Sequence, residues 1–323
     1  MVVFLLLVLM NMYLVGSSKG QLEVGFYGGS CPNVEAIVGG VVRDAAASDQ
    51  NTAPVLLRLH FHDCFVEGCD ASIMIDNSVE GDERHAFGHQ GVGGFDVIER
   101  AKAEVEAVCP GVVSCADILA LAAREALLLA KGPWYEVELG RRDGVVSNVA
   151  SADNMPDVTD SIHTLKAKFL QKGLTDKDLV LLTAAHSIGT TACFFMNHRL
   201  YNFPADGGSD PSIKPAFLPE LKSTCPKNGD VNVRLPMDRG SGQVFDSQIF
   251  QNIRSGFAVL QSDAALYQDE TTKGIIDSYF GPLEPFFGPS FEADFADAMV
   301  RMGRIGVLTG VQGTIRRTCA TFN

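Results

Sequence analysis

The pattern of apolar and polar residues along this chain predicts a mostly helical protein. Residues 116–130 combine strong helix formers with apolar side chains on almost every side, so a buried helix is expected there, stopped by Gly132 and Pro133. Residues 33–48 predict another helix, although Gly39 and Gly40 lie inside it and each costs about 1 kcal/mol relative to alanine. The packing of that helix must offset this cost.

The second half of the chain carries signals for helix ends. Gly173 ends one predicted helix, and Thr175, with Asp178 three residues later, can cap the next. The capped helix is expected to present His186 to the wall of a cavity from its C-terminal end. A last helix is predicted over residues 291–304, ending at Gly306.

Residues 202–241 contain several glycines and prolines and are predicted to be irregular, held in place by Cys225. The chain shows no repeat at solenoid periods and no low-complexity run. With 46% apolar residues, it can build a large core of the kind found in globular proteins.

The first residues predict a signal peptide. Residues 2–15 are apolar, uncharged and too short for a membrane span, and small residues stand at Ser18 and Gly20. We expect residues 1–20 to be cleaved off before Gln21, so that no membrane segment remains. The alternative is an uncleaved membrane anchor, because no basic residue stands near Met1. Cleavage removes only Lys19 among the charged residues and changes the formal charge from −13 to −14. A surface this acidic repels nucleic acids and other anionic polymers.

The eight cysteines are an even number behind a signal peptide, which predicts an oxidising compartment and four disulfides. Eight cysteines allow about 105 pairings, so the sequence by itself leaves the pairing open. The cysteines lack the paired CxxC spacing of structural zinc sites.

Residues 58–72 hold the densest group of chemically active side chains. A helix ending near Cys64 places Arg58 and His62 one turn apart on the same face, so both enter one pocket. The loop closed by Cys64 and Cys69 offers hard oxygen donors of the kind that Ca²⁺ prefers. Alternatively, a helix end rich in histidine is ordinary surface, and two aspartates in a turn bond to their own backbone. The oxygen donors are the side chains of Asp63, Asp70 and Ser72 and the carbonyls of Val66 and Gly68.

This stretch closely resembles the distal haem motif of the plant secretory (class III) haem peroxidases. The resemblance continues, in order and at the spacing of that family, through residues 113–119, 139–144, 178–189, 244–246, 260–263, 299–303 and 308–310. Together these motifs cover nearly everything from Gln21 to Cys319.

The resemblance implies an all-α haem peroxidase fold in which one haem b lies between a distal half, about residues 21–165, and a proximal half, about residues 166–323. We expect a protein secreted to the apoplast or cell wall. The vacuole is disfavoured because only four residues follow Cys319, and a monomer is the default state. The disulfides it implies are Cys31–Cys109, Cys64–Cys69, Cys115–Cys319 and Cys193–Cys225.

The same resemblance assigns the catalytic groups. His186 is implied to be the axial ligand of the haem iron, with Asp263 accepting a hydrogen bond from its other ring nitrogen. His62 is implied to be the general base that takes a proton from hydrogen peroxide, and Arg58 stabilises the charge that develops. Phe61 shields this side of the haem. Taken alone, His186 would be an ordinary packed histidine.

Two Ca²⁺ sites are implied. The first consists of Asp63, Val66, Gly68, Asp70 and Ser72, with Glu83 acting through water. The second consists of Ser187, Asp238, Ser241, Val244 and Asp246. Because Ser187 directly follows His186, loss of the second ion should loosen the haem.

The expected substrates are hydrogen peroxide and small phenolic donors that reach the haem edge. By resemblance, Pro156 offers its carbonyl to the hydroxyl of the donor, and Phe87 and Phe195 form walls of the access channel.

One departure from the family pattern lies beside the catalytic base. Glu83 and Ala86 fit the pattern, but His89 stands where an asparagine usually orients the distal histidine. An imidazole accepts that hydrogen bond only while neutral, and an unperturbed imidazole titrates near pH 6.5. We therefore hypothesise weak peroxide activation in acid, with Gln90 as an alternative source of the amide.

Three other functions stay open at this point. A haem- and calcium-binding wall protein with impaired turnover would follow if His89 disables His62. An intracellular haem peroxidase without disulfides or Ca²⁺ is disfavoured by the cysteines and the signal peptide. A calcium-binding module without haem would lack a Soret band.

Overall fold

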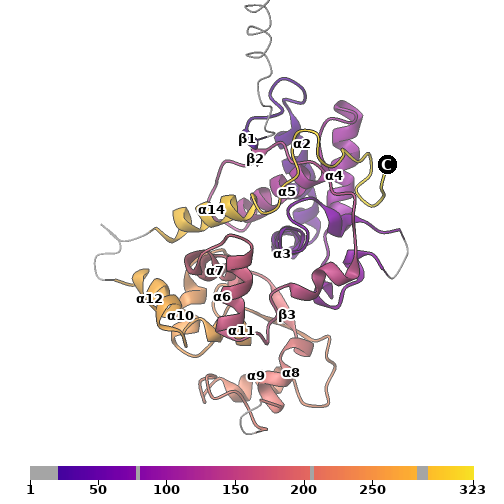
Figure 1. Cartoon of the computed structure of the whole chain (residues 1–323). Helices are drawn as coiled ribbons and strands as arrows, with labels where there is room; N and C mark the ends of the chain where they lie inside the picture. Colours follow the sequence, from indigo (N-terminus) through magenta and orange to yellow (C-terminus); the bar gives the residue numbers. More distant parts are fainter. Residues whose placement is uncertain (1–20, 78–80, 204–206, 282–289) are drawn as a thin grey trace, which may run out of the picture.

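The computed structural model describes residues 21–77, 81–203, 207–281 and 290–323 (Figure 1). The predicted signal peptide lies outside these described residues. Helices dominate the described part, as the sequence pattern predicts, and the only regular strands in it form two short two-stranded sheets. Among the described residues, no helix has the length and apolar character needed to cross a membrane.

The N-terminal half is built around two adjacent helices, α3 (Thr52–Phe65) and α5 (Cys115–Leu129). Both α2 (Val34–Ser48) and α4 (Phe95–Val108) pack against α5 (Figure 1). The helix α5 is buried on nearly all sides, which explains its apolar sequence. The strands β1 (Glu23–Val24) and β2 (Glu138–Leu139) pair beside these helices, and short 3-10 turns complete this half: η1 (Ser72–Met74), η2 (Glu83–His85), η3 (Phe87–His89) and η4 (Val149–Asn154).

The C-terminal half is built around α7 (Asp176–Thr183). This helix packs against α6 (Ile162–Gln171), α12 (Glu270–Ser278) and α14 (Phe291–Met302). The Gly303 carbonyl, directly after α14, accepts hydrogen bonds from Arg141, so the end of the last helix contacts the N-terminal half. The remaining elements are η5 (Ala184–Ser187), η6 (Cys193–Phe195), α8 (Asn197–Tyr201), α9 (Leu218–Thr224), α10 (Gln248–Arg254) and α11 (Gln261–Ala265).

Two expectations from the sequence need correction. The helix predicted to carry His186 ends at Thr183, and His186 lies in the 3-10 turn η5 that follows. The segment 202–241 is not wholly irregular, because it contains α9 and the strand β4 (Arg234–Pro236). β4 pairs with β3 (Thr190–Ala192), more than forty residues earlier in the chain, and local sequence patterns do not reveal such distant pairing.

The predicted capping of α7 is present as a complete capping box. The Thr175 hydroxyl accepts a hydrogen bond from the Asp178 backbone N–H at 3.2 Å, and the Asp178 carboxylate accepts one from the Thr175 N–H at 2.9 Å. The helix that leads to His186 therefore begins at a defined residue.

Replacing Thr175 with alanine is expected to lower the free energy of unfolding by about 1 kcal/mol, because the Asp178 backbone N–H loses its capping acceptor and the Asp178 carboxylate loses the hydrogen bond from the Thr175 hydroxyl. Guanidinium unfolding measures the effect. Thr175→Ser keeps the hydroxyl and should unfold like the wild type. An alanine variant as stable as the serine variant would contradict the role of the cap.

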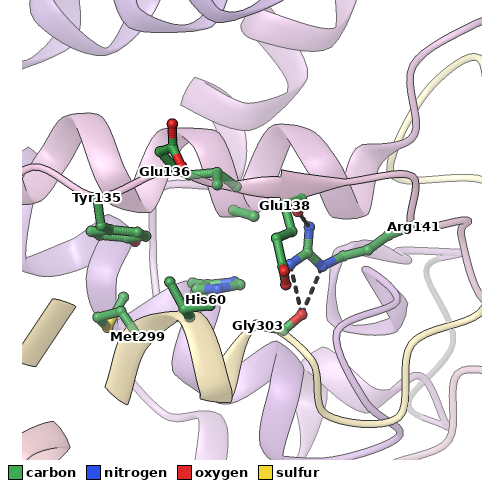
Figure 2. A pocket seen from close by; sticks show the side chains of 10 residues that line it. His60, Tyr135, Glu136, Glu138, Arg141, Met299 and Gly303 are labelled. Carbon is green, nitrogen blue, oxygen red and sulfur yellow. Dashed lines mark hydrogen bonds between the residues drawn. The ribbon is translucent and has the colours of Figure 1, made fainter. Parts of the chain in front are cut away.

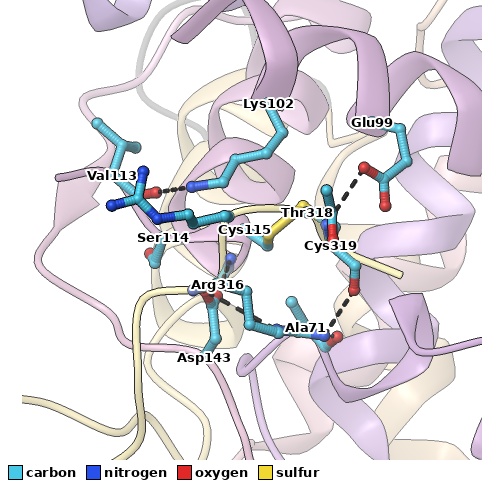
Figure 3. The surroundings of a disulfide bond; sticks show 12 residues. Ala71, Glu99, Lys102, Val113, Ser114, Cys115, Asp143, Arg316, Thr318 and Cys319 are labelled. Atoms are coloured by element: carbon cyan, nitrogen blue, oxygen red, sulfur yellow. Dashed lines mark hydrogen bonds and ion pairs between the residues drawn. A yellow bond between two sulfur atoms is a disulfide. The ribbon is translucent and has the colours of Figure 1, made fainter. Parts of the chain in front are cut away.

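The structure contains four disulfides, and they are the four pairs expected from the resemblance. The bond between Cys115 and Cys319 fastens the C-terminal segment to the start of α5 (Figure 3). Beside it, the buried Arg316 donates to the carbonyls of Cys319 and Ala71 at 2.7 and 2.6 Å. The two halves of the chain are thus joined covalently and by buried hydrogen bonds.

Candidate active site and calcium sites

The helix α3 brings Arg58 and His62 together, as their spacing predicts. The Nε of Arg58 donates to the Nε2 of His62 at 3.1 Å, and its Nη2 donates to the Gln90 carbonyl at 3.0 Å. Burial, followed by the positive charge of Arg58, holds the pKa of His62 well below its ordinary value. Burial also lowers the pKa of Arg58, but only to about 10, so the guanidinium stays charged. The pocket therefore combines a neutral imidazole with a fixed cation.

The turn η3 places His89 against His62, on the side away from Arg58. The Nδ1 atoms of the two imidazoles are 2.7 Å apart, and both side chains are buried. The Nε2 of His89 lies 3.5 Å from the Oε1 of Glu83. His89 is therefore the residue that contacts the Nδ1 of His62, whereas Gln90 contributes its backbone carbonyl to Arg58.

Phe61 forms part of the same site from the neighbouring position on α3. Its ring is half-buried and stacks on Phe65 with centroids 4.2 Å apart. Phe61 also contacts the ring of His62 edge-on. This packing restricts the positions open to both side chains.

His186 lies in the turn η5, close enough to Arg58 for the charge of that guanidinium to lower its pKa. Its Nδ1 lies 2.9 Å from the Oδ1 of Asp263, which comes from α11 and is fully buried. Burial lowers the pKa of His186, but the Asp263 carboxylate outweighs it and the net shift is upward. No described residue hydrogen-bonds the Nε2 of His186, and a third of its side chain is exposed. A histidine fixed through one nitrogen, with the other available, is suited to ligate haem iron.

The loop after α3 contains buried oxygen atoms without protein partners. Asp63 and Glu83 are fully buried, yet the Oδ1 of Asp63 and both carboxylate oxygens of Glu83 lack hydrogen-bond partners among the described residues. The hydroxyl of Ser72 is equally unpartnered. Burial and the charges of Asp70 and Glu83 raise the pKa of Asp63 well above its ordinary value. Such a set of oxygens fits a bound Ca²⁺, whose charge would stabilise the carboxylates.

Two other implied ligands of the first calcium site, Val66 and Asp70, already accept hydrogen bonds from the protein. The carbonyl of Val66 accepts a hydrogen bond from the Nζ of Lys172 at 2.7 Å. Asp70 accepts one from the Ser72 backbone N–H at 3.0 Å, which leaves its second oxygen for a cation. Gly68 adopts a left-handed φ of +124°, and a side chain there would collide with Gly306.

The second group of oxygen donors follows His186. The hydroxyl of Ser187 is buried without a partner among the described residues. The hydroxyl oxygen of Ser241 lies 2.6 Å from the Asp238 carboxylate and 3.0 Å from that of Asp246, so its single hydrogen can be donated to either one. The Gly189 backbone N–H donates to the Gly242 carbonyl at 3.1 Å, so the loop that contains Val244 lies beside η5. This arrangement also fits a cation.

The residues implied in donor binding lie at the surface. Phe87 is 66% exposed and Phe195 is half-buried. Phe194, which the sequence analysis did not single out, connects them, with ring centroids 6.2 Å from Phe87 and 5.1 Å from Phe195. Pro156 is half-buried in the segment between η4 and α6. The aromatic cluster became visible only when the fold brought η3 and η6 together.

A second histidine of α3, His60, points away from this site into a small cavity (Figure 2). Beside it, Arg141 donates two hydrogen bonds to the Gly303 carbonyl, at 2.9 and 2.6 Å. Burial, followed by the charge of Arg141, lowers the pKa of His60 to about 3. A permanently neutral, packed histidine is structural, so the two histidines of one helix have different environments.

The chain matches the family model described as "Peroxidase" over residues 38–281. It is similar to Peroxidase 43 of Arabidopsis thaliana, with 63% identity over 308 residues that cover 95% of this chain and 94% of that protein. Peroxidase 13 of Arabidopsis thaliana is 56% identical, covering 96% and 95%, and Peroxidase N1 of Nicotiana tabacum is 48% identical, covering 93% and 90%. The similarity thus extends over nearly the whole length of each relative.

Proposed function

Since this chain belongs to the plant class III peroxidase family, an oxidoreductase family that acts on hydrogen peroxide, we propose that it binds one haem b and two Ca²⁺ ions and oxidises phenolic donors outside the cell. The observation that carries this proposal is the pairing of two histidine systems. His62 has a hydrogen-bonded, neutral imidazole on α3, and His186 has a carboxylate-fixed imidazole on η5.

His62 is the proposed proton acceptor. Its Nε2 accepts from Arg58 and therefore carries a lone pair, which is the requirement for taking a proton from hydrogen peroxide. Arg58 would stabilise the negative charge that develops as the O–O bond breaks. Haem supplies the redox-active iron at which the peroxide is reduced.

His186 is the proposed ligand of that iron. The buried Asp263 fixes the ring orientation and accepts the proton of Nδ1, which increases the electron density of the ligating nitrogen. Asp263 comes from α11 and His186 from η5, so the packing of the C-terminal half determines the geometry of the ligand. Arg58 and His62 come from the N-terminal half and His186 and Asp263 from the C-terminal half. We therefore propose one domain with a distal half, about residues 21–165, and a proximal half, about residues 166–323.

The proposed donors are small phenols. The exposed rings of Phe87 and Phe194, next to Phe195, give an aromatic surface on which a phenol can stack, and we assign the carbonyl of Pro156 to the donor hydroxyl. We propose that the mature protein is a secreted monomer of the apoplast or cell wall.

Stopped-flow mixing of the haem-loaded protein with hydrogen peroxide tests the proposal, followed by turnover of guaiacol. A rapid change of the Soret band with steady guaiacol oxidation is expected. Haem binding without turnover would instead favour the alternative of a haem- and calcium-binding wall protein. The contact of 2.7 Å between His62 and His89 supports the active enzyme.

A pH series from 5 to 8 in the same experiment tests the sequence-based hypothesis about His89. The pKa of His62 is held well below its ordinary value, so His62 remains neutral and able to accept a proton as pH falls through 6.5. If the rate constant with peroxide falls below pH 6.5, protonation of a group other than His62 must be the cause. That result would support the hypothesis that His89 weakens peroxide activation in acid. A flat rate would contradict it.

Removing Ca²⁺ with a chelator is expected to lower the free energy of unfolding. When the free Ca²⁺ concentration is about 100 times the Kd of a site, binding there stabilises the folded protein by about 2.7 kcal/mol. Loss of the ion leaves buried carboxylates such as Asp63 without a counter-ion. Thermal unfolding with EGTA, followed by restoring Ca²⁺, measures the effect, with Mg²⁺ as the control ion. An unchanged melting temperature would contradict both calcium sites.

A further inference from the structure

Arg234 is an exposed arginine that two hydrogen bonds hold in one place beside the candidate active site. It is the first residue of β4, and this strand pairs with β3, which begins at Thr190, four residues after His186. The Nε of Arg234 donates to the Thr190 hydroxyl at 2.7 Å, and its Nη2 donates to the Thr190 carbonyl at 2.8 Å. These contacts fix the orientation of the planar guanidinium.

The guanidinium of Arg234 lies near that of Arg58. Burial, followed by the charge of Arg234, lowers the pKa of Arg58 to about 10. Burial and the charge of Arg58 also lower the pKa of His186, against the larger opposite effect of Asp263. Because charges act on one another over about 10 Å in salt solution, Arg58 is close to both Arg234 and His186.

Neither arginine has an acidic partner in the part of the chain that the structure describes. There, Arg234 donates to the hydroxyl and carbonyl of Thr190, which are uncharged. Arg58 donates to the neutral ring of His62 and to the carbonyl of Gln90. Neighbouring like charges repel, and a bound anion removes that cost. In a chain with 39 acidic and 26 basic residues, two neighbouring arginines without a carboxylate therefore indicate an anionic ligand.

Haem b carries its carboxylates along one edge of the ring. We propose that Arg234 binds a haem carboxylate and that the Thr190 hydroxyl is the second donor to it. The Thr190 oxygen accepts from Arg234, so the hydrogen of that hydroxyl is available for donation. The Nη1 of Arg234 has no acceptor among the described residues, and a guanidinium is suited to pair with a carboxylate. This inference rests on the proposed function, because it requires the chain to bind haem.

The rate of haem loss from the holoprotein tests the proposal without using activity. Excess apomyoglobin captures the released haem, and the Soret band follows the transfer. Arg234→Leu is expected to release haem about 10- to 100-fold faster than the wild type, the usual effect of losing a hydrogen bond between charged groups. Arg317→Leu, at a side chain that is 71% exposed, should release it at the wild-type rate. An Arg234→Leu protein that holds haem as long as the wild type would overturn the proposal.

A second measurement asks whether Arg234 recognises the carboxylate itself. The full-length wild-type and Arg234→Leu chains are each loaded with the dimethyl ester of haem b, whose carboxylates are capped and uncharged. We expect the substitution to change the release rate of the ester by less than about twofold, because the interacting group has already been removed. If the substitution accelerated release of the ester as much as release of haem b, Arg234 would act through packing and the proposal would fail.

The carboxylate of a phenolic donor is the other possible ligand of this cation. KM values for a phenol that bears a carboxylate and for the matching uncharged alcohol distinguish the two sources. A KM that rises in Arg234→Leu for the charged phenol alone, with haem release unchanged, would overturn the assignment to haem. If wild-type holoprotein does not react with peroxide but its haem retention depends on Arg234, the proposed function fails while the carboxylate site stands.

Discussion

Replacing His62 with leucine is expected to slow the reaction of the haem-loaded protein with hydrogen peroxide by about 10²- to 10⁴-fold, the usual contribution of a general base. The variant loses the lone pair that receives the proton, and Arg58 loses its hydrogen-bond acceptor at 3.1 Å. Haem binding should be unchanged because the substitution leaves the proposed ligand His186 and its partner Asp263 intact. Stopped-flow absorbance measures the rate constant, and the Soret band of the resting protein measures haem content.

Two further variants make this result specific. His163→Leu alters an exposed histidine on α6 and should react like the wild type. His186→Ala should instead lose haem, because it removes the proposed ligand. If His62→Leu reacted with peroxide at the wild-type rate while retaining haem, His62 could not be the proton acceptor.

Much of this site can be predicted from the sequence because its signals are local. Arg58 and His62 are one helical turn apart, so any helix through them brings them together. Thr175 and Asp178 form a capping box over three residues. These interactions need no knowledge of the rest of the fold.

Other features could not be predicted because they depend on contacts between distant segments. The strand β4 forms only where β3 lies beside it, and Phe194 joins Phe87 only because η6 meets η3. The histidine at position 89 was visible in the sequence, but its positions against His62 and the buried Glu83 required the fold.

The largest expected loss of stability is at Arg316, which takes no part in the proposed reaction with peroxide. This side chain is fully buried and donates to the carbonyls of Ala71 and Cys319, and its Nε lies 3.9 Å from the Asp143 carboxylate, which is also buried. Figure 3 shows Arg316 beside Asp143, with Ala71 and Cys319 nearby. Asp143 receives further hydrogen bonds from the backbone N–H groups of Ala116 and Arg316.

Arg316→Met is therefore expected to lower the free energy of unfolding by about 3–5 kcal/mol, because it leaves a buried carboxylate without its cation. Guanidinium unfolding with the disulfides intact measures the change. The neighbouring Arg317, whose side chain is 71% exposed, supplies the matched control, since Arg317→Met should change the stability by less than about 1 kcal/mol. Equal effects of the two substitutions would contradict the role of Arg316.

The same substitution should also weaken the first calcium site. Arg316 holds the carbonyl of Ala71, which lies between the candidate calcium ligands Asp70 and Ser72. The backbone N–H of Ala71 in turn donates to Asp63 at 3.1 Å. Without Arg316, the loop that provides the calcium ligands is held less firmly. Titration with Ca²⁺ is therefore expected to give a higher Kd for Arg316→Met than for Arg317→Met. An equal Kd for both variants would show that Arg316 anchors the C-terminal segment but does not support the calcium site.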